Sequence, residues 1–369
     1  MIDPIFNMFK VRFAKMDSLK VLDQSVDRIN FYINLENVFK VIMNPRVDSF
    51  MKASCQDRNE SKLNLVSNII NLGQHYRLYA AKYGKESRII LFWNYPKSEY
   101  KNEKYIDGYR SYYNHKMFQN MSSCDFLSRL LEESYSFLTI VMKYINQVYL
   151  ISGGSIESSV IPLLVHENVY AEDGISTQNI IITNEKYDYQ YHLKGFTILE
   201  PNKENPILVK PEDDVIELLK KQAGIKNKKS IPTNLIPFTI CLLGNKYRNI
   251  PKLAGVGLGT IINMINVAID RIIITENSTD VNLLKEIITI NHREQFVKNY
   301  LCTNLDYQMK EITPLEINLI TRQLEDKFDD NTVKQMNERY FKKFPLMIIK
   351  SRSEQVYNDN YPRKSIFDK

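Results

Sequence analysis

Cysteine, glycine and proline are all scarce in this sequence. Its four cysteines form no Cys-x-x-Cys pair: they are Cys55, Cys124, Cys241 and Cys302. Neither a zinc site nor a disulfide framework is therefore predicted, and this usage fits a reducing compartment. The 12 glycines and 13 prolines are few for 369 residues, so any place where glycines gather needs an explanation.

Long hydrophobic runs are also missing. The N-terminus lacks the basic, apolar and small-residue regions of a signal peptide. The apolar stretch 137–151 is interrupted by Lys143, Asn146 and Gln147, so it does not resemble a membrane span. We therefore expect a soluble protein of the cytoplasm, or of the host cytoplasm if the protein is viral.

The composition is that of an ordinary globular protein, with 44% hydrophobic and 25% charged residues. The length allows one large domain or two modest ones. Lys and Arg number 49 against 43 Asp and Glu, which gives a formal net charge of +6. This excess permits a polyanionic partner without demanding one.

Short apolar runs alternate with helical patterns in the first two thirds of the chain. Buried strands are predicted at 29–33, 88–92, 148–151 and 179–183, and helices at 62–82, 123–145 and 157–165. This alternation predicts an α/β fold with a central, mostly parallel sheet flanked by helices. A further helix is expected from Pro314, with Thr313 as its cap.

The glycines gather in one stretch, GNKYRNIPKLAGVGLGT, at residues 244–260. Three of them recur at two-residue spacing, namely Gly255, Gly257 and Gly259. Asn249 and Pro251 predict a turn just before them, and a helical pattern resumes after Thr260. A helix opened by glycines exposes backbone N–H groups that suit phosphates. From the glycines alone, a tight helix–helix turn in which they serve only packing is equally compatible.

This stretch resembles the helix-three-turn-helix of the flap endonuclease family, the PIN-like, structure-specific 5′ nucleases. The match covers Gly244, Asn249, Ile250, Pro251, Gly255, Gly257 and Thr260. The resemblance spans residues 29–345, and REQFVKNYLCTNLDY is most similar to short phage members called ribonuclease H. It implies a PIN-like domain at 29–219, a DNA-binding helix-three-turn-helix subdomain at 220–300 and a C-terminal helical region at 301–369. Residues 1–28 would be an N-terminal extension.

The resemblance also assigns positions to the carboxylates that hold two divalent metals in this family. At these positions the sequence has mostly neutral or basic residues, namely Asn34, Asn94, Ile156, Ser158, Ser159, Tyr187, Asn245 and Arg248. Only Glu185 keeps a carboxylate. Glu157 and Asp188 lie one residue away, a shift that turns a strand side chain to the other face and rotates a helical one by about 100°. The resemblance therefore implies a pseudo-nuclease without a metal cofactor, with Glu185 as the one remaining candidate ligand.

Basic side chains would contact the phosphates of DNA. Residues 99–113 interleave bases with aromatics, a composition that binds phosphates and stacks on bases, although a solvated loop is equally compatible. The DNA-binding set implied by the resemblance is Lys101, Lys104, Arg110, Lys116, Lys246, Lys252, Gly255, Gly257, Gly259 and Thr260.

Three functions remain open. The leading hypothesis is a catalytically inactive flap endonuclease homologue that binds duplex or branched DNA, as an accessory factor in viral or phage DNA transactions. The second is a protein-interaction or specificity subunit of a replication, transcription or virion assembly, for which a polymerase or another protein of that assembly would be the partner. The third is an active Mg²⁺-dependent 5′–3′ nuclease whose acids have been relocated.

Overall fold

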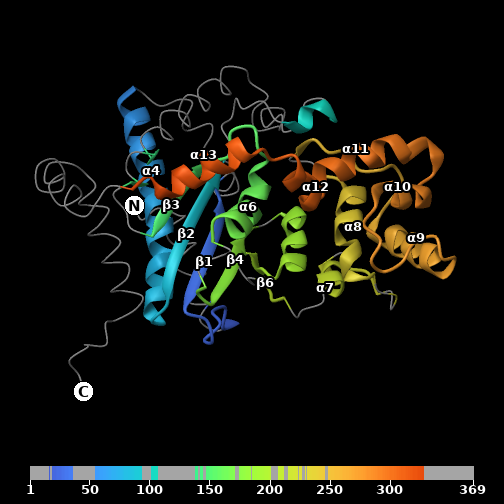
Figure 1. Ribbon diagram of the computed structural model, residues 1–369, viewed down its shortest axis with the longest axis horizontal. Helices are drawn as coiled ribbons and strands as arrows, with labels where there is room; N and C mark the ends of the chain where they lie inside the picture. The colour runs from blue at the N-terminus through green and yellow to red at the C-terminus, as the bar shows by residue number, and fades with distance from the viewer. Residues whose placement is uncertain are drawn as a thin grey trace, which may run out of the picture.

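A six-stranded sheet forms the centre of the structure, a computed structural model (Figure 1). It describes residues 16, 19–35, 55–93, 101–106, 138–139, 142–143, 147–170, 174–183, 185–200, 207–211, 215–222, 224–226, 229, 231–245 and 248–327. The strands lie in the order β3-β2-β1-β4-β5-β6. Their bounds are Arg28–Asn34 (β1), Glu86–Trp93 (β2), Val148–Ser152 (β3), Thr177–Ile182 (β4), Thr197–Glu200 (β5) and Ile207–Val209 (β6).

All neighbouring strands are parallel except β5 and β6, which are antiparallel. Because the first five strands are parallel, their carboxyl ends meet at one edge of the sheet. That edge is where β1 ends at Asn34, β3 at Ser152 and β4 at Ile182. Loops leaving this edge are therefore placed close to one another.

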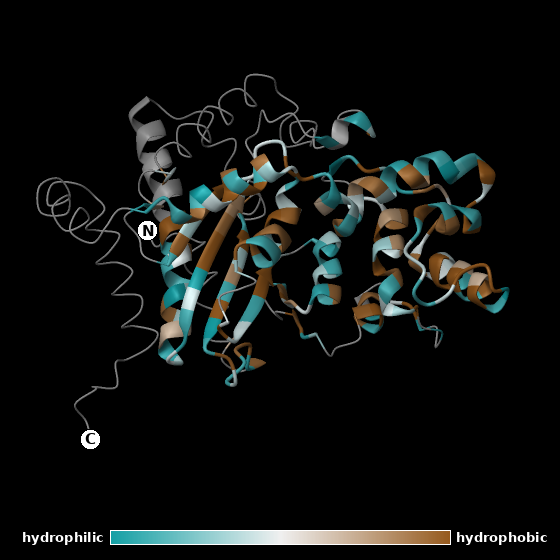
Figure 2. Cartoon of the chain, viewed as in Figure 1, coloured by the Kyte–Doolittle hydropathy of each residue, from teal (hydrophilic) through white to brown (hydrophobic). Residues whose placement is uncertain are grey.

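Successive strand residues contribute to two different hydrophobic cores, because side chains alternate between the faces of a sheet. Phe31, Ile33 and Leu91 pack in the core on the face covered by the long helix α4 (Cys55–Lys82). Tyr32 and Ile90 pack on the opposite face, in a larger core that reaches into the C-terminal helices. Figure 2 shows hydrophobic residues along the strands. The continuous apolar strand sequences thus reflect burial on both faces, as expected for parallel strands.

A helical lobe follows the sheet in the chain and lies at the right of Figure 1. Its α-helices are α8 (Ile236–Leu243), α9 (Leu258–Asp270), α10 (Val281–Leu284), α11 (Arg293–Thr303) and α12 (Leu305–Lys310). Helices α6 (Ile161–Asn168) and α7 (Val215–Gln222) and the 3₁₀ segment η5 (Lys186–Lys194) come earlier in the chain. The larger core contains residues from both the sheet and the lobe. The predicted division at residue 219 stays a prediction.

Helix α13 (Pro314–Glu325) returns to the sheet and covers its β3 edge. The side-chain amide of Gln323 pairs with this edge, accepting from the Ser152 N–H at 2.8 Å and donating to the Ser152 carbonyl at 3.2 Å. The helix begins with a capping box formed by Thr313 and Glu316. The predicted cap at Thr313 is thus confirmed, and the exposed backbone of an edge strand is satisfied by a side chain.

The predicted α/β fold is confirmed, with differences in detail. The strands predicted at 29–33, 88–92, 148–151 and 179–183 are all present, but the short strands β5 and β6 were not predicted. The predicted helix at 157–165 begins with a 3₁₀ turn, η4 (Ser158–Val160). Most of the predicted N-terminal extension and of the helix at 123–145 lies outside the described residues. No helix in the described part of the chain is long and apolar enough to cross a membrane.

Candidate functional site

Three charged side chains from distant segments meet at the carboxyl ends of the strands. One terminal nitrogen of Arg248 donates to Glu157 Oε1 at 2.9 Å and to the Ser159 hydroxyl at 2.9 Å. The other terminal nitrogen donates to Glu185 Oε2 at 3.2 Å. The side chains of Arg248, Glu157 and Glu185 are only 2%, 2% and 6% exposed. We name these three residues the acid–arginine cluster.

A tight turn between residues 245 and 250 positions the arginine. The Asn245 N–H donates to the Ile250 carbonyl at 3.0 Å, and the Ile250 N–H donates back to the Asn245 carbonyl at 2.9 Å. The Arg248 N–H also donates to the Asn245 carbonyl, at 3.1 Å. Asn249 has a φ of +54°, in the left-handed region that asparagine tolerates. Asn245, a position where the resemblance implies a lost acid, therefore helps to hold the backbone from which Arg248 enters the cluster.

Thr183, the residue after β4, organises the acidic side of the site. Its hydroxyl accepts from the Glu185 N–H at 2.9 Å and donates to Asp188 Oδ2 at 2.5 Å. Asp188 is 1% exposed. Burial and then the negative charge of Glu185 raise the pKa of Asp188 to about 7, against the opposing effect of Arg248 and of the Thr183 hydrogen bond. The site therefore contains more buried acids than the single arginine can neutralise in full.

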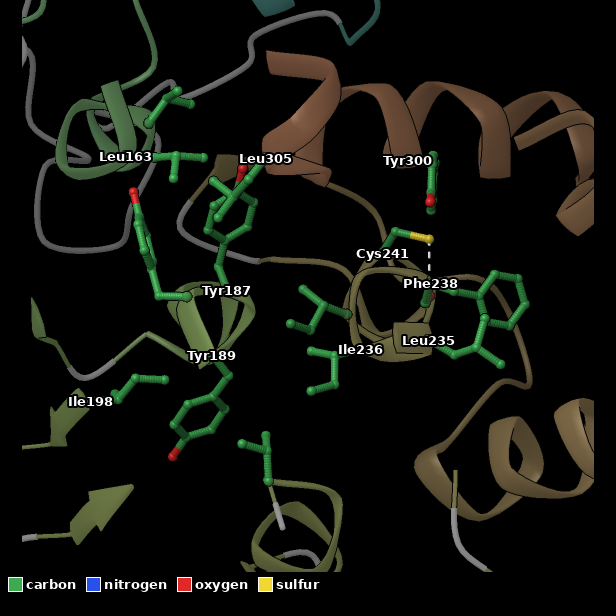
Figure 3. Close-up of a cluster of buried hydrophobic side chains, with 14 of the residues drawn as sticks. Leu163, Tyr187, Tyr189, Ile198, Leu235, Ile236, Phe238, Cys241, Tyr300 and Leu305 are labelled. Atoms are coloured by element: carbon green, nitrogen blue, oxygen red, sulfur yellow. Dashed lines mark hydrogen bonds between the residues drawn. The ribbon is translucent and has the colours of Figure 1, made fainter. Parts of the chain in front are cut away.

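An aromatic ring of the core lies against the arginine of this site. The Arg248 guanidinium lies over the Tyr187 ring, 4.0 Å from its centroid, a favourable cation–π arrangement. Figure 3 shows Tyr187 near Leu163 of α6 and Leu305 of α12, while Tyr189 points toward Ile198 of β5. Burial raises the pKa of the Tyr187 hydroxyl above its usual range, so this group stays neutral. These contacts keep the guanidinium in an environment of low polarity, where its ion pairs are strong.

The expectation that a one-residue shift turns Glu157 away from the site is wrong. Glu157 has φ −61° and ψ 122° and precedes η4 as its N-cap, so it belongs neither to a helix nor to a strand. The rotation rules for those elements do not apply to it. Its carboxylate also accepts from the Ser159 hydroxyl at 3.3 Å. Ser159 thus contacts both Glu157 and Arg248, and Ser158 is fully buried beside it.

Other predicted positions lie at the same edge of the sheet. Asn34 ends β1 and is 1% exposed, and Ile156 is 4% exposed in the loop after β3. Asn94 lies outside the described residues. The sequence analysis did not predict that Arg248 pairs with two acids. The resemblance placed the segment of Arg248 beside the carboxylate of Glu185, and the positive charge of Arg248 was a signal from which an ion pair could have been predicted.

The residues at this edge do not fit a pair of divalent cations. Two-metal catalysis needs several carboxylate oxygens arranged around ions about 4 Å apart. Here the guanidinium lies between Glu157 and Glu185 and uses one oxygen of each. Across the described ranges, no group of three or more His, Cys, Asp or Glu side chains is arranged to hold a metal ion.

The glycine-rich hairpin connects α8 to α9 and contains two kinds of glycine. At Gly244, with φ +65°, an added Cβ would lie 2.6 Å from the Lys252 nitrogen and 2.7 Å from the Ile250 carbonyl oxygen, so this glycine serves close packing. Gly255 has a φ of +71°, which favours glycine. At Gly257 and Gly259 an added Cβ would meet nothing within 4 Å. Packing within this chain therefore does not explain the last two glycines.

Gly257 and Gly259 stand at the start of helix α9. Gly257 is the N-cap of α9 and offers no side-chain hydrogen bond to it. The first turn of a helix has N–H groups without partners in the helix and carries partial positive charge. Thr260, in the same turn, is exposed, as is Lys252 before the hairpin. We name residues 252–260 the glycine hairpin.

The predicted basic residues differ in what they contact. Lys101 donates to Glu316 at 2.7 Å and to the Glu311 carbonyl at 2.6 Å, while Lys104 pairs with the Glu311 carboxylate at 2.7 Å. Burial opposes ionisation of Glu316, but hydrogen bonds from Lys101, Thr313 and Ser155 outweigh it and lower its pKa to about 2. Lys101 thus binds helix α13 to the 3₁₀ turn Lys101–Lys104. Arg110, Lys116 and Lys246 lie outside the described residues.

A mostly parallel sheet with a helical hairpin after its carboxyl edge is the fold of the 5′-exonucleases and flap endonucleases. The chain is similar to a pseudo-enzyme–product complex of the bacteriophage T5 flap endonuclease with DNA and metal ions, at 13% identity and a TM-score of 0.51. It is also similar to the T5 5′-exonuclease with divalent zinc ions bound, at 12% identity and a TM-score of 0.51. Each alignment covers 81% of this chain and 99% of the other. No protein-family model and no curated protein sequence matches the chain, and at these identities the likeness concerns the fold alone.

Proposed function

We propose that this protein is a catalytically inactive relative of the 5′ flap endonucleases that binds duplex or branched DNA through its glycine hairpin. The observation that supports this proposal is the contrast within residues 244–260. Arg248 fills the acidic edge of the sheet, whereas Gly257 and Gly259 leave the first turn of α9 open. The first feature opposes metal-dependent chemistry, and the second suits contact with a phosphate backbone.

Binding of this kind would be independent of base sequence. Phosphate contacts position a protein on DNA without reading the bases. Backbone N–H groups of α9, the exposed Lys252 and the Thr260 hydroxyl would supply the contacts. Lys101 and Lys104 are weaker candidates because carboxylates of the same chain already pair with them. The neighbour solved with DNA and metal ions has the same fold, which adds weight to a DNA partner.

The deciding experiment measures equilibrium binding of the purified protein to a labelled 5′-flap duplex in EDTA, over a salt series, with linear duplex as the comparison. Binding that weakens steeply with salt is expected, because bound counterions are released from the phosphates. Preference for the flap would identify a clamp on branched DNA. Absence of binding at low salt would contradict the proposal. Flap cleavage in Mg²⁺ by the unmodified protein would instead support the active nuclease with relocated acids.

A second function is favoured by a different observation. Ile272 and Ile290, both in the helical lobe, are 86% and 79% exposed. Ile272 also has a φ of +58°, a conformation that is unfavourable for a β-branched residue. Such residues suit a protein interface, so a role as the interaction subunit of a replication, transcription or virion assembly is the alternative. Co-purification with a polymerase or capsid protein, together with no DNA binding, would support it.

A further inference from the structure

Arg248 connects the turn before the glycine hairpin to the loops at the carboxyl edge of the sheet. It belongs to the turn that leads into the glycine hairpin, whereas Glu157 and Glu185 follow strands β3 and β4. Its two terminal nitrogens each reach a different carboxylate, at 2.9 and 3.2 Å. The ion pairs therefore fix the start of the hairpin against the carboxyl edge of the sheet.

The surroundings make these ion pairs difficult to exchange for water. All three side chains are almost completely buried, and Asp188, also buried, adds a third acid nearby. A buried carboxylate without a counter-charge is strongly unfavourable, so removing the arginine would leave the acids uncompensated. Arg248 supplies the positive charge that the structure places between the carboxylates of Glu157 and Glu185.

We infer that Arg248 is a positioning residue that takes the place of a divalent cation, holding the glycine hairpin in its DNA-binding position without any metal. This inference rests on the proposed function only in giving the hairpin a DNA-binding role. Helix α8 and the residue just before the hairpin are also tied to helix α11, since the Asn299 amide donates to the Cys241 carbonyl at 3.2 Å and to the Pro251 carbonyl at 2.7 Å. Arg248 supplies the connection on the side of the sheet.

The chain offers a matched control in Arg28. This arginine is 4% exposed and pairs with Glu86 at 3.0 Å, but at the opposite end of the sheet, where β1 and β2 begin. Neutralising either arginine removes a buried charge that is bound to glutamate. Arg28→Gln and Arg248→Gln should therefore both lower the melting temperature, by about 5 °C for the almost fully buried cluster. Only the second change touches the hairpin.

The experiment follows amide hydrogen exchange of the full chain without DNA, in EDTA and again in Mg²⁺. In Arg248→Gln, the amides of Ile250, Leu253 and Val256, which donate backbone hydrogen bonds, should exchange about tenfold faster than in the wild type, while amides of β1 and β4 change less. Arg28→Gln should leave the hairpin amides protected. Arg248→Lys should give an intermediate result, because one ammonium cannot reach both carboxylates as the guanidinium fork does. If Arg248→Gln fails to fold, Arg248→Lys carries the comparison alone.

Two results would overturn the inference. One is unchanged hairpin exchange in Arg248→Gln and Arg248→Lys, or acceleration equal to that in Arg28→Gln. The other is slower hairpin exchange of the wild type in Mg²⁺, which would mean that a metal ion still contributes. Because exchange is measured without DNA, these results are independent of DNA binding. If the wild type does not bind the flap duplex, the proposed function is contradicted. The role of Arg248 in positioning the hairpin is then unaffected.

Discussion

The two ends of the segment 244–260 are surrounded very differently. At its beginning, Gly244 is packed against the backbone of the following turn and Arg248 is buried between two carboxylates. At its end, Gly257 and Gly259 face open space. The interior of this protein thus determines the first part of the segment, whereas the second part is free to be shaped by a partner. A single sequence motif combines a structural anchor with an open surface.

The largest effect is expected from Gly244→Ala, which tests the packed end. The new Cβ would meet the Lys252 nitrogen and the Ile250 carbonyl oxygen at under 3 Å, in a backbone conformation with φ +65°. We expect a loss of about 3 kcal/mol in the free energy of unfolding. Urea unfolding followed by circular dichroism measures it. A loss below the error of the measurement would show that the backbone of the turn moves to accommodate the new Cβ. The packed and open ends of the segment would then differ less in their tolerance of a side chain.

The open end is tested by Gly259→Ala. Within helix α9 alanine is favoured over glycine, so the free energy of unfolding should rise by about 0.5–1 kcal/mol. Affinity for duplex DNA should nevertheless fall about tenfold, because a methyl group would separate the backbone from the phosphate. Fluorescence anisotropy with labelled duplex measures the affinity. Unchanged affinity would indicate that DNA, if bound, does not approach this turn.

A smaller effect is expected from Lys252→Ala, at an exposed position beside the hairpin. Removing one phosphate contact should weaken binding severalfold on every duplex sequence and reduce the salt slope by about 1. Thermal stability should not change. The salt series used for the wild type gives both quantities. A loss of affinity on one sequence only would point to base contacts instead of phosphate contacts.

The smallest effect concerns Lys101→Met, a residue expected from sequence to bind DNA. Hydrogen bonds from Lys101 and its neighbours depress the Glu316 pKa to about 2 from its ordinary value of 4.5. An acid whose pKa is lower in the folded state than in the unfolded state stabilises the fold at pH values above the unfolded-state pKa. This contribution is lost as the pH falls from 4.5 toward 2. The partly exposed pair contributes at most about 1 kcal/mol. We expect the free energy of unfolding of the variant to fall by that amount at pH 6 and by a smaller amount near pH 2. Its affinity for DNA should equal that of the wild type.

Much of the fold follows directly from the sequence. Continuous apolar runs such as Arg88–Phe92 could only be buried on both faces of a sheet, and Thr313 with Glu316 three residues later defined the start of a helix. The short strands β5 and β6 were missed because four and three residues give no usable periodicity. The turn at Asn249 was predicted because asparagine followed by Ile-Pro favours a turn, and Asn249 indeed has a positive φ.

The site was harder to predict, because its contacts join residues far apart in sequence. Lys101 pairs with a glutamate 215 positions away, and no local pattern predicts such a partner. Glu157 was assigned to a regular element, whereas it lies in an extended residue just before a 3₁₀ turn. The loss of acids at the positions implied by the resemblance stays a prediction, since the family itself is suggested by fold alone.

The sequence by itself determined the positions of the four longest strands along the chain, the position of the turn and the unusual clustering of glycines. These depend on local conformational preference and on hydrophobic periodicity, which a short window contains. Only the tertiary structure decided that Arg248 lies between Glu157 and Glu185, 91 and 63 residues away, and that a Cβ added at Gly257 or Gly259 would meet nothing within 4 Å. Burial and charge pairing depend on how the sheet brings its loops together, and no single stretch of sequence contains that information.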